Sequence, residues 1–378
     1  MVNEQKREAG KIEETKFVDD TLREGMQAPG ITFSSEERKK LAGHMKKTGI
    51  RHVVVSYPSA HRSELEFAEW LVSQKYFDAV YALGRSTLTD VKIIEESGAD
   101  IYLHLPFDLH LDEKINDTLK YASNTGKRLR VSIPRAFELP DEILKRTLLY
   151  LNHYVLDSVV IADTTGLSTP KKTGEVVRLA KQVLESEISV HFHNDHGLAL
   201  ANSYQSVCDG AASVDVSIFG IGERNGIADT ASLEYMLADT EKIHAFDRKE
   251  MQEAYRYLAG LIDGKAGTSF FRNNVPNYGG NLGIHTAGTH ASFSDIFRGS
   301  EFSVNVYTGS SMVRTILEQN GISVDEHGLR RFVNLIKDKS AGEGRSLSTG
   351  EVLAMWSTVD RFLPDHAGNP SREGQHNS

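Results

Sequence analysis

Two histidines and a glutamate are spaced so that they could hold a metal ion. His191 and His193 lie two residues apart, and residues two apart on a strand project to the same face. Val190 and Phe192 would then take the other face. Together with the carboxylate of Glu24, the imidazoles would make a two-histidine, one-carboxylate set that leaves positions open for water and substrate. The pattern therefore predicts a divalent metal site.

A guanidinium and a carboxylate stand side by side in the run Asp19–Gln27, where Arg23 precedes Glu24. Catalytic residues of barrel enzymes come from the carboxyl ends of strands, so the pair would be well placed if this run follows a strand of a barrel. The alternative is a solvated surface ion pair, which is the commoner state of such neighbours. The pair gains functional meaning only jointly with the two histidines.

A third polar run, Phe219–Asp229, is rich in glycine. Its glycines would allow the backbone to approach a ligand closely, and the following helix N-terminus could hold a phosphate or carboxylate. A dinucleotide-binding fingerprint is not supported, because the third glycine, the upstream first strand and the later ribose-binding acid are not in place.

The composition limits both the chemistry and the compartment. The 378 residues include 15 histidines but only one cysteine, Cys208, so metal ligands must be nitrogen and oxygen atoms and an internal disulfide is excluded. A formal net charge of −9 argues against a general nucleic-acid binder. The chain has no run of about 18 apolar residues and no signal-peptide pattern. We expect a protein of the reducing cytoplasm that binds neither nucleic acid nor membrane.

Short apolar runs rich in Val and Ile recur over the first two thirds of the chain, separated by segments with helical spacing of apolar residues. Ser34 and the pair Thr169-Pro170 are helix start signals. Eight strand–helix repeats predict an α/β fold, a (β/α)8 TIM barrel, with a doubly wound open sheet as the alternative. The eight runs are Lys16–Asp20, Arg51–Ser56, Ala79–Leu83, Asp100–Leu105, Arg128–Ile133, Ser158–Ala162, Ile188–His193 and Ser213–Phe219.

The residue composition and the spacing of apolar residues change after Leu261. Residues 262–288 are dense in Gly and Asn and predict an irregular connector or cover. Helical spacing returns in Ser310–Asn320, Asp325–Lys339 and Ser348–Phe362. We therefore expect an N-terminal tail (1–15), a TIM-barrel catalytic domain (16–262), a smaller, mainly helical C-terminal region acting as a lid or dimerisation region (263–363) and a disordered tail (364–378).

Together, the polar runs resemble the DRE-TIM metallolyase superfamily, and within it the Claisen-condensing branch of homocitrate, isopropylmalate and citramalate synthases. The signature Asp-x-Thr-Leu-Arg-(Asp/Glu)-Gly-x-Gln falls on Asp19–Gln27, and His-x-His-Asn-Asp with its following Gly-Leu-Ala and Ala-Asn falls on His191–Asn202. Gly220–Ile227 is most similar to the homocitrate synthase version of its segment, and Ala162–Gly166 matches the strand-six segment. The resemblance covers roughly Phe17–Leu237.

The resemblance implies a metal site and a catalytic cation. Glu24, His191 and His193 would be the ligands of a divalent ion, which would be Zn, Mg or Mn. Arg23 would stabilise the enolate or the developing alkoxide, as a positive charge already aimed at its target does in a low-dielectric site.

Four further residues fall on the family's acceptor pocket. Arg130 and Ser132 match an Arg-x-Ser that helps to hold the 2-oxoacid in homocitrate synthases, and Thr164 matches the strand-six threonine. His104 would be a further substrate contact. An arginine at this place favours an acceptor with a second anionic group. The alternative for Arg130 is a structural ion pair at the barrel mouth.

The C-terminal region carries the candidate base. Residues 284–291 read Ile-His-Thr-Ala-Gly-Thr-His-Ala and resemble a family segment whose last histidine is the general acid/base, usually delivered from the partner subunit of a homodimer. His290 takes this place, and His285 would be a helper or a packed ring. A neutral imidazole near pH 7 suits proton abstraction from the methyl group of acetyl-CoA.

The chain departs from the homocitrate synthase pattern at two places. Pro134 occupies the position of a glutamate that is linked to the base, and Glu301 stands where a tyrosine is expected after the catalytic histidine, Tyr307 being the nearest tyrosine. Either the proton-transfer network is rebuilt, with Asp295 or Tyr307, or the acceptor differs from that of homocitrate synthesis.

The resemblance implies a metal-dependent acyltransferase that condenses acetyl-CoA with a 2-oxoacid and releases CoA. Candidate acceptors are 2-oxoglutarate, oxaloacetate and a phosphonate or phosphinate analogue of pyruvate, as in a phosphinomethylmalate synthase, and the missing glutamate favours a specialised acceptor. The alternatives are a hydroxymethylglutaryl-CoA lyase-like enzyme, whose cysteine-bearing glycine loop is absent here, and a catalytically silent barrel that serves as a binding subunit.

Overall fold

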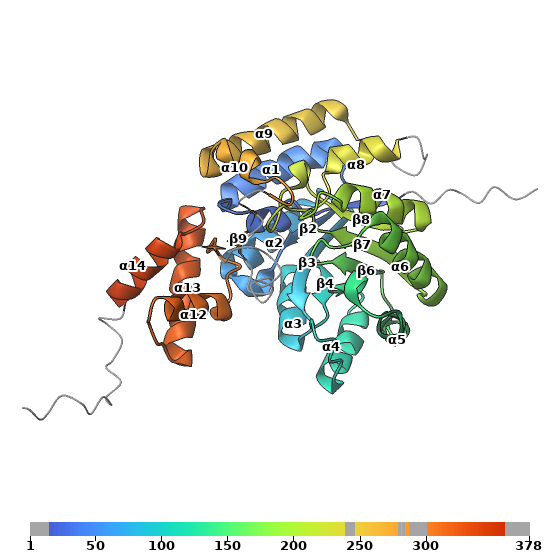
Figure 1. Cartoon of the computed structure of the whole chain (residues 1–378), viewed down its shortest axis with the longest axis horizontal. Coiled ribbons are helices and arrows are strands. Elements are labelled where there is room, and N and C mark those ends of the chain that lie inside the picture. Colours follow the sequence, from blue (N-terminus) through green and yellow to red (C-terminus); the bar gives the residue numbers. More distant parts are fainter. Residues whose placement is uncertain (1–14, 239–245, 279–280, 282–283, 287–300, 360–378) are drawn as a thin grey trace, which may run out of the picture.

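A computed structural model of the chain shows a closed barrel of eight parallel strands (Figure 1). It describes residues 15–238, 246–278, 281, 284–286 and 301–359. β1 pairs with both β2 and β8, which closes the sheet and excludes the open doubly wound alternative. The strands are β1 (Lys16–Asp19), β2 (His52–Ser56), β3 (Ala79–Arg85), β4 (Asp100–His104), β5 (Leu129–Ile133), β6 (Ser158–Asp163), β7 (Glu187–Phe192) and β8 (Ser213–Val216).

Helices follow the strands and cover the outside of the barrel. In α1 the Ser34 hydroxyl accepts the amide of Glu37 while the Glu37 carboxylate accepts the amide of Ser34, and α6 begins after Thr169 with Pro170 in its first turn. Both predicted start signals are confirmed. The helices are α1 (Ser35–Thr48), α2 (Arg62–Gln74), α3 (Leu88–Ser97), α4 (Glu113–Ser123), α5 (Asp141–Leu151), α6 (Pro170–Val183), α7 (Ala199–Asp209) and α8 (Thr230–Leu237).

Strand alternation decides which side chains reach the barrel interior. In β5, Val131 and Ile133 join the large apolar core between the strands and the helices. Arg130 points inward, where its guanidinium lies over the rings of Tyr81 and Tyr102. The same alternation turns polar residues at the carboxyl ends of the strands toward the mouth.

The helix at the end of the predicted barrel domain, α9 (Arg248–Ala266), crosses into the predicted C-terminal region. α9 runs along α1 (Figure 1) and continues past the boundary predicted at residue 262. Its buried positions Met251, Ala254, Leu258 and Ile262 recur at helical spacing up to that boundary, so the helix has no reason to stop there. The elements after α9 are α10 (Ser269–Asn273), β9 (Ile284–His285), β10 (Glu301–Phe302), α12 (Ser310–Gln319), α13 (Glu326–Glu343) and α14 (Thr349–Val359).

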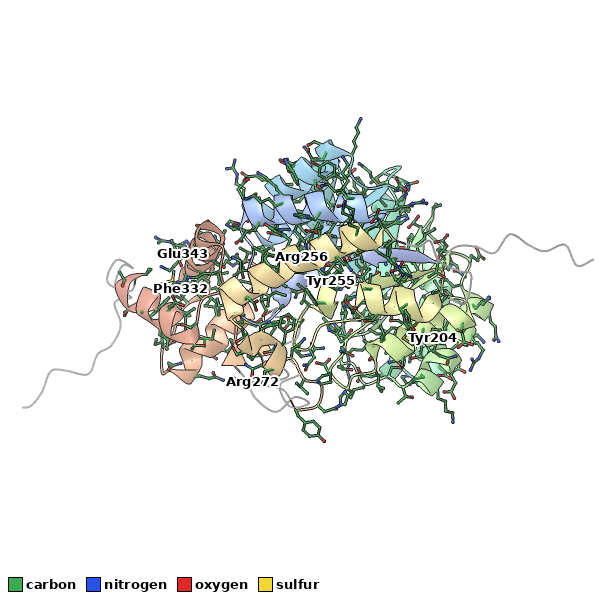
Figure 2. The ribbon with its side chains drawn as sticks, turned by 90° about the horizontal axis from the view of Figure 1, so that it is seen from above. Tyr204, Tyr255, Arg256, Arg272, Phe332 and Glu343 are labelled. Carbon is green, nitrogen blue, oxygen red and sulfur yellow. The ribbon has the colours of Figure 1, made fainter. Side chains whose placement is uncertain are left out.

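The last three helices form a second, smaller core beside the barrel (Figures 1 and 2), in which Phe332 packs edge to face on Trp356. The segment before α12 attaches this unit to the barrel mouth, since Asn305 Nδ2 donates to the carbonyl of Met26 at 2.7 Å. The predicted tails lie outside the described residues, except for Thr15. Within the described ranges, every helix is too short or too polar to cross a membrane.

A fully buried ion pair joins the loops that follow β7 and β8. Arg224 Nε and Nη2 donate to the two carboxylate oxygens of Asp195 at 2.9 and 2.8 Å, and neither side chain is exposed. Nη2 also donates to the carbonyl of Thr164, at 2.8 Å, after β6. One guanidinium thus fixes three neighbouring loops at the barrel mouth.

We predict that Arg224→Ala lowers the free energy of unfolding by about 3–5 kcal/mol, because the change leaves Asp195 buried without its partner. Urea denaturation followed by circular dichroism measures the loss. The matched control is Arg62→Ala, whose pair with Glu66 is exposed and should contribute less than about 1 kcal/mol. Equal midpoints for the two variants would contradict a structural role of the buried pair.

Candidate active site

The carboxyl ends of the strands open into a cavity of about 760 Å³. Residues predicted for the site from five different strand ends line it together. The predicted residues in its wall are Arg23, Glu24, His104, Ser132, Thr164, His191 and His193. The wall does not include Arg130, and His290 and Asp295 lie outside the described residues.

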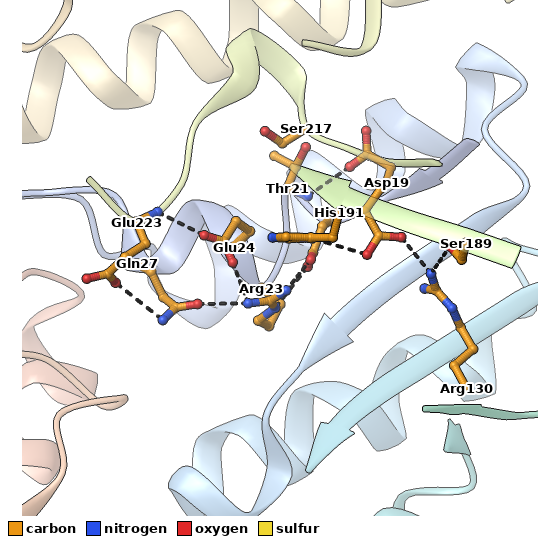
Figure 3. Close-up of polar contacts among 12 residues, drawn as sticks. Asp19, Thr21, Arg23, Glu24, Gln27, Arg130, Ser189, His191, Ser217 and Glu223 are labelled. Carbon is orange, nitrogen blue, oxygen red and sulfur yellow. Dashed lines mark hydrogen bonds and ion pairs between the residues drawn. The ribbon is translucent and has the colours of Figure 1, made fainter. Parts of the chain in front are cut away.

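His191 on β7 and His193 directly after its end both reach the cavity, and their rings lie 5.1 Å apart between centroids. His191 Nδ1 is 3.2 Å from a carboxylate oxygen of Asp215 on β8. Figure 3 shows the opposite edge of the His191 ring turned toward Glu24. The hydrogen bond to Asp215 therefore fixes the ring and leaves its other nitrogen for a ligand in the cavity.

The donor groups around His191 fit a divalent ion. One ligand atom from each of Asp20, His191 and Asp215 lies within 4.8 Å of the others, and all three residues are buried. Nitrogen and oxygen donors of this kind suit Zn, Mg or Mn. The predicted set of Glu24, His191 and His193 shares only His191 with this cluster. Glu24 is not part of this cluster, and its carboxylate accepts hydrogen bonds from Arg23 and from the backbone amide of Glu223.

Arg23 is buried among acceptors rather than solvated at the surface. Its guanidinium pairs with Asp20 and Glu24, and its Nη1 donates to Gln27 Oε1 at 2.8 Å (Figure 3). Burial opposes its charge, but the carboxylates of Asp20 and Glu24 outweigh that effect and raise the pKa of Arg23. The contacts hold the guanidinium in one position at the cavity wall, where only 7% of the residue is exposed.

The electrostatic surroundings set different protonation states across the mouth. Burial raises the pKa of Asp20 to about 7, with Arg23 opposing this shift and Glu24 adding to it. Burial lowers the pKa of His104 to about 4, and the positive charges of Arg23 and His191 lower it further. His104 is therefore neutral near pH 7, and it lies close enough to Arg23 and His191 for their charges to affect its pKa.

Arg130 lies below the cavity, inside the barrel. Its Nη2 donates to Asp215 at 2.6 Å and to Ser189 Oγ at 2.7 Å (Figure 3), and 1% of the residue is exposed. This position departs from the expectation that Arg130 touches the acceptor, and it matches the alternative of a structural ion pair. The guanidinium is drawn inward because Asp215 is itself buried and needs a cation.

The glycine-rich loop after β8 passes close to the side chain of Glu24. A Cβ atom on Gly222 would lie 2.6 Å from Glu24 Cγ, so only glycine fits beside Glu24. The next residue, Glu223, accepts the amide of Thr286 at 2.8 Å and the side-chain amide of Gln27 at 3.3 Å. The chain that leads toward His290 is therefore anchored next to Glu24.

Pro134 and Tyr307 both lie in the cavity wall. Pro134 lines the cavity and offers no carboxylate. The Tyr307 hydroxyl donates to Glu64 on α2 at 2.5 Å, and Glu64 in turn accepts Arg38 Nη1 at 2.6 Å. Burial and the charge of Glu64 raise the pKa of Tyr307 well above its ordinary value, so the phenol stays protonated.

Sequence reasoning missed several residues of the site, namely Asp20, Gln27, Tyr57, Glu64, Arg85 and Asp215. One signal was available for Asp215, which interrupts the apolar run of β8 between Val214 and Val216. A charged residue inside a buried strand requires a partner and so marks a polar network. No comparable sequence signal marks Glu64, which faces inward from an ordinary amphipathic helix.

A family model with the description HMGL-like matches residues 14–257. The chain belongs to the HMGL-like family. The match spans every strand of the barrel and reaches into α9, and it confirms the resemblance to the DRE-TIM metallolyase superfamily.

Named relatives of this HMGL-like chain include synthases. The chain is 27% identical over 379 residues to a probable 2-isopropylmalate synthase of Archaeoglobus fulgidus, covering 91% of this chain and 73% of the relative. It is 28% identical over 340 residues to a homocitrate synthase of Pyrococcus abyssi, covering 82% and 91%.

Solved structures confirm the TIM-barrel fold. A hydroxymethylglutaryl-CoA lyase from Pseudomonas aeruginosa aligns with a TM-score of 0.58 and 19% identity over 69% of this chain and 97% of the lyase. The carboxyl transferase domain of Rhizobium etli pyruvate carboxylase aligns with a TM-score of 0.60 and 12% identity, covering 68% of this chain and 48% of that one. At these identities the likeness concerns the fold.

We predict that Asp215→Asn weakens binding of Zn²⁺, Mg²⁺ or Mn²⁺ by about 10- to 100-fold, because His191 loses the partner that orients it. His191→Ala should remove the bound ion. Titration calorimetry and metal analysis of the purified proteins measure both effects without any need for turnover. His153→Ala, at an exposed histidine on the outside of the barrel, is the control. Unchanged metal content in the His191→Ala variant would contradict the predicted metal site at His191.

Proposed function

We propose that this protein is a metal-dependent, homocitrate synthase-like enzyme that condenses acetyl-CoA with a 2-oxoacid carrying a second anionic group and releases CoA. The observation that carries the proposal is the single cavity in which Arg23, Glu24, His191 and His193 meet at the ends of β1 and β7. The relatives named homocitrate synthase and 2-isopropylmalate synthase support condensation as the reaction class.

Glu24, His191 and His193 would hold the ion, with Asp20 and Asp215 beside them. A bound divalent ion would supply Lewis acidity toward the carbonyl group of the acceptor. Because Asp215 already orients His191 and Gly222 lets the backbone approach Glu24, these side chains need little reorganisation to bind.

Arg23 supplies positive charge where negative charge develops on oxygen. Its position is fixed by Asp20 and Gln27 before any ligand arrives, which is the condition for electrostatic stabilisation of a transition state. The hydroxyl groups of Ser132 and Thr164 line the same cavity and would orient the acceptor carboxylate. Neutral His104 would complete this side with a hydrogen bond.

The base that we propose is His290, which removes a proton from the methyl group of acetyl-CoA. The resulting carbon attacks the carbonyl carbon of the 2-oxoacid, and the new alkoxide takes up a proton. Water then cleaves the thioester. Acetyl-CoA, the 2-oxoacid and water thus yield a 2-hydroxy-2-carboxymethyl acid and free CoA. In this scheme Tyr307 takes the place of the tyrosine that the family has and this chain lacks.

We further propose a homodimer in which His290 crosses the subunit interface, residues 16–262 as the catalytic domain and 263–363 as the lid or dimerisation region. The cytoplasm is the proposed compartment, consistent with the single cysteine. The acceptor is proposed to be 2-oxoglutarate, oxaloacetate or a phosphonate or phosphinate analogue of pyruvate.

Thiol release from acetyl-CoA tests the proposed reaction. Metal-loaded protein is assayed with a panel of 2-oxoacids, with and without a second anionic group, and the product acid is identified by mass spectrometry. We expect thiol release that depends on the acceptor. Silence with every acceptor would overturn the synthase, and cleavage of hydroxymethylglutaryl-CoA by the same preparation would favour the lyase. If neither thiol release nor lyase cleavage is detected, the remaining alternative is a catalytically silent barrel that serves as a binding subunit.

We predict that His290→Ala lowers kcat at least about 100-fold, the ordinary contribution of a general base, while bound metal is unchanged. Arg23→Gln should lower kcat by a similar factor, because one preorganised donor is lost. His110→Ala, at an exposed histidine, is the control for His290. Normal turnover after His290→Ala would place the base elsewhere.

A further inference from the structure

Arg85 is a second arginine at the barrel mouth, placed at the last position of β3 and in the wall of the cavity. It lies opposite His104 in the register of β3 and β4, so the two side chains come from neighbouring strand ends. The charges of Arg23 and His191 in turn help to lower the pKa of His104. Arg85 therefore stands one strand away from a residue that faces the candidate metal site.

One edge of the Arg85 guanidinium is occupied. Nε donates to Asp90 Oδ2 at 3.0 Å and Nη2 donates to Asp90 Oδ1 at 2.8 Å, which is a bidentate pair. Asp90 is fully buried on α3 and also accepts the backbone amide of Arg85 and the hydroxyl of Tyr57. A carboxylate held by so many donors cannot move, so it fixes the plane of the guanidinium.

The other edge of the same guanidinium is available to a ligand. A guanidinium has five N–H donors, and its second fork, formed by Nη1 and Nη2, can pair with a further oxyanion. Among the described residues, Asp90 is the carboxylate that pairs with Arg85, the Tyr57 hydroxyl also interacts with the guanidinium, and 64% of the Arg85 side chain is exposed. The free fork therefore faces solvent at the cavity rather than another protein carboxylate.

The other cations near the cavity are less suited to bind a ligand anion. Arg23 is surrounded by Asp20, Glu24 and Gln27, and Arg130 is buried beneath the cavity on Asp215. Lys114 lines the rim but lacks a fork geometry.

A second cation strengthens the positive potential beside Arg85. Lys337 on α13 donates to the carbonyl of Ala60 at 2.7 Å, and burial together with the charge of Arg85 lowers the pKa of Lys337 to about 8. Lys337 thus adds positive charge in the region of Arg85, where the carboxylates of Asp90 and Glu64 also lie.

We propose that the free fork of Arg85 binds the second anionic group of the acceptor, a carboxylate or a phosphorus oxyanion, and so replaces Arg130 in selecting the acceptor. The inference rests on the proposed function, since it assigns one end of the acceptor to β3 and the other to the candidate metal site. Arg85 is thus a specificity residue, and Asp90 is the positioning residue that holds it.

The test compares acceptors rather than rates alone. In Arg85→Gln we expect KM for 2-oxoglutarate, oxaloacetate or phosphonopyruvate to rise by about 10- to 100-fold, the usual effect of losing a hydrogen bond to a charged group. KM for pyruvate, which lacks the second anion, should stay the same. An equal rise in KM for all acceptors would overturn the proposal.

Arg128→Gln is the matched control, because Arg128 is also half-exposed and paired with an aspartate, Asp100, but lies at the opposite end of the barrel just before β5. Arg85→Lys keeps the charge and loses the fork, so it should show most of the rise in KM. It also keeps the test decisive if Arg85→Gln fails to fold.

A second arm separates the acceptor from the phosphates of CoA, which carry the same chemistry. KM is compared for acetyl-CoA and for S-acetylpantetheine, which lacks the nucleotide. Arg85→Gln should change neither. A rise with acetyl-CoA alone would overturn the assignment to the acceptor and place a CoA phosphate at Arg85.

Binding measurements separate this inference from the proposed function. Titration calorimetry of metal-loaded protein with 2-oxoglutarate, oxaloacetate or phosphonopyruvate, without acetyl-CoA, requires no turnover. Weaker binding to Arg85→Gln, with pyruvate binding unchanged, would support the anion site even if no thiol is released. Equal affinity of wild type and variant for every dianion would overturn it even if the synthase reaction is found.

Discussion

A carboxylate buried inside an eight-stranded barrel needs positive partners, and this requirement at Asp215 governs the site. One oxygen accepts Arg130 at 2.6 Å and the other lies 3.2 Å from His191. Burial opposes ionisation, but Arg130 outweighs it and lowers the pKa of Asp215. The ionised group then orients His191 toward the cavity and keeps Arg130 below it. The orientation of His191 and the position of Arg130 outside the cavity wall therefore have one physical cause.

A similar requirement attaches the C-terminal region to the barrel. Glu64 is buried between α1 and α2, where Arg38 neutralises it from one side and the Tyr307 hydroxyl solvates it from the other. Tyr307 is therefore held in the cavity wall by an interaction that the barrel already needs. Pro134, which follows β5 in the cavity wall, has no donor or acceptor side chain. Tyr307, which comes from outside the barrel, adds a polar group to the same wall.

Local pattern was sufficient to predict the barrel and the convergence of its strand ends. Strand alternation predicts His191 and His193 on one face, and the structure brings both to the cavity with Glu24, although β7 itself ends at Phe192. The partner of Arg130 could not be predicted, because Asp215 lies 85 residues away on a strand whose register is a tertiary property. The contact of Tyr307 with Glu64 spans 243 residues and depends on how the last helices dock. Sequence spacing indicates which face a residue takes, and packing decides what it meets there.

The net charge of −9 says little about the potential inside the cavity, because nearby charges in a low-dielectric wall act more strongly than distant screened ones. Arg23 is paired there with Asp20 and Glu24. Asp112 also lines the cavity, but its carboxylate is engaged as the cap of α4, accepting the amide of Ile115. Among the described residues of the cavity wall, the further cations are Lys114 and Arg85, and Arg85 is paired with Asp90 but keeps 64% of its side chain exposed.

The mouth is therefore divided between two kinds of chemistry. Groups that suit a metal ion lie on β1, β7 and β8, and cations that attract anions lie on β3 and the start of α4. Neutral His104 lies between them on β4. A ligand that contacts both sides must carry a metal-chelating end and an anionic end, joined by a chain long enough to pass His104. A 2-oxoacid with a second acidic group has this form, whereas a monoanionic acceptor would leave the positive side of the cavity without a partner.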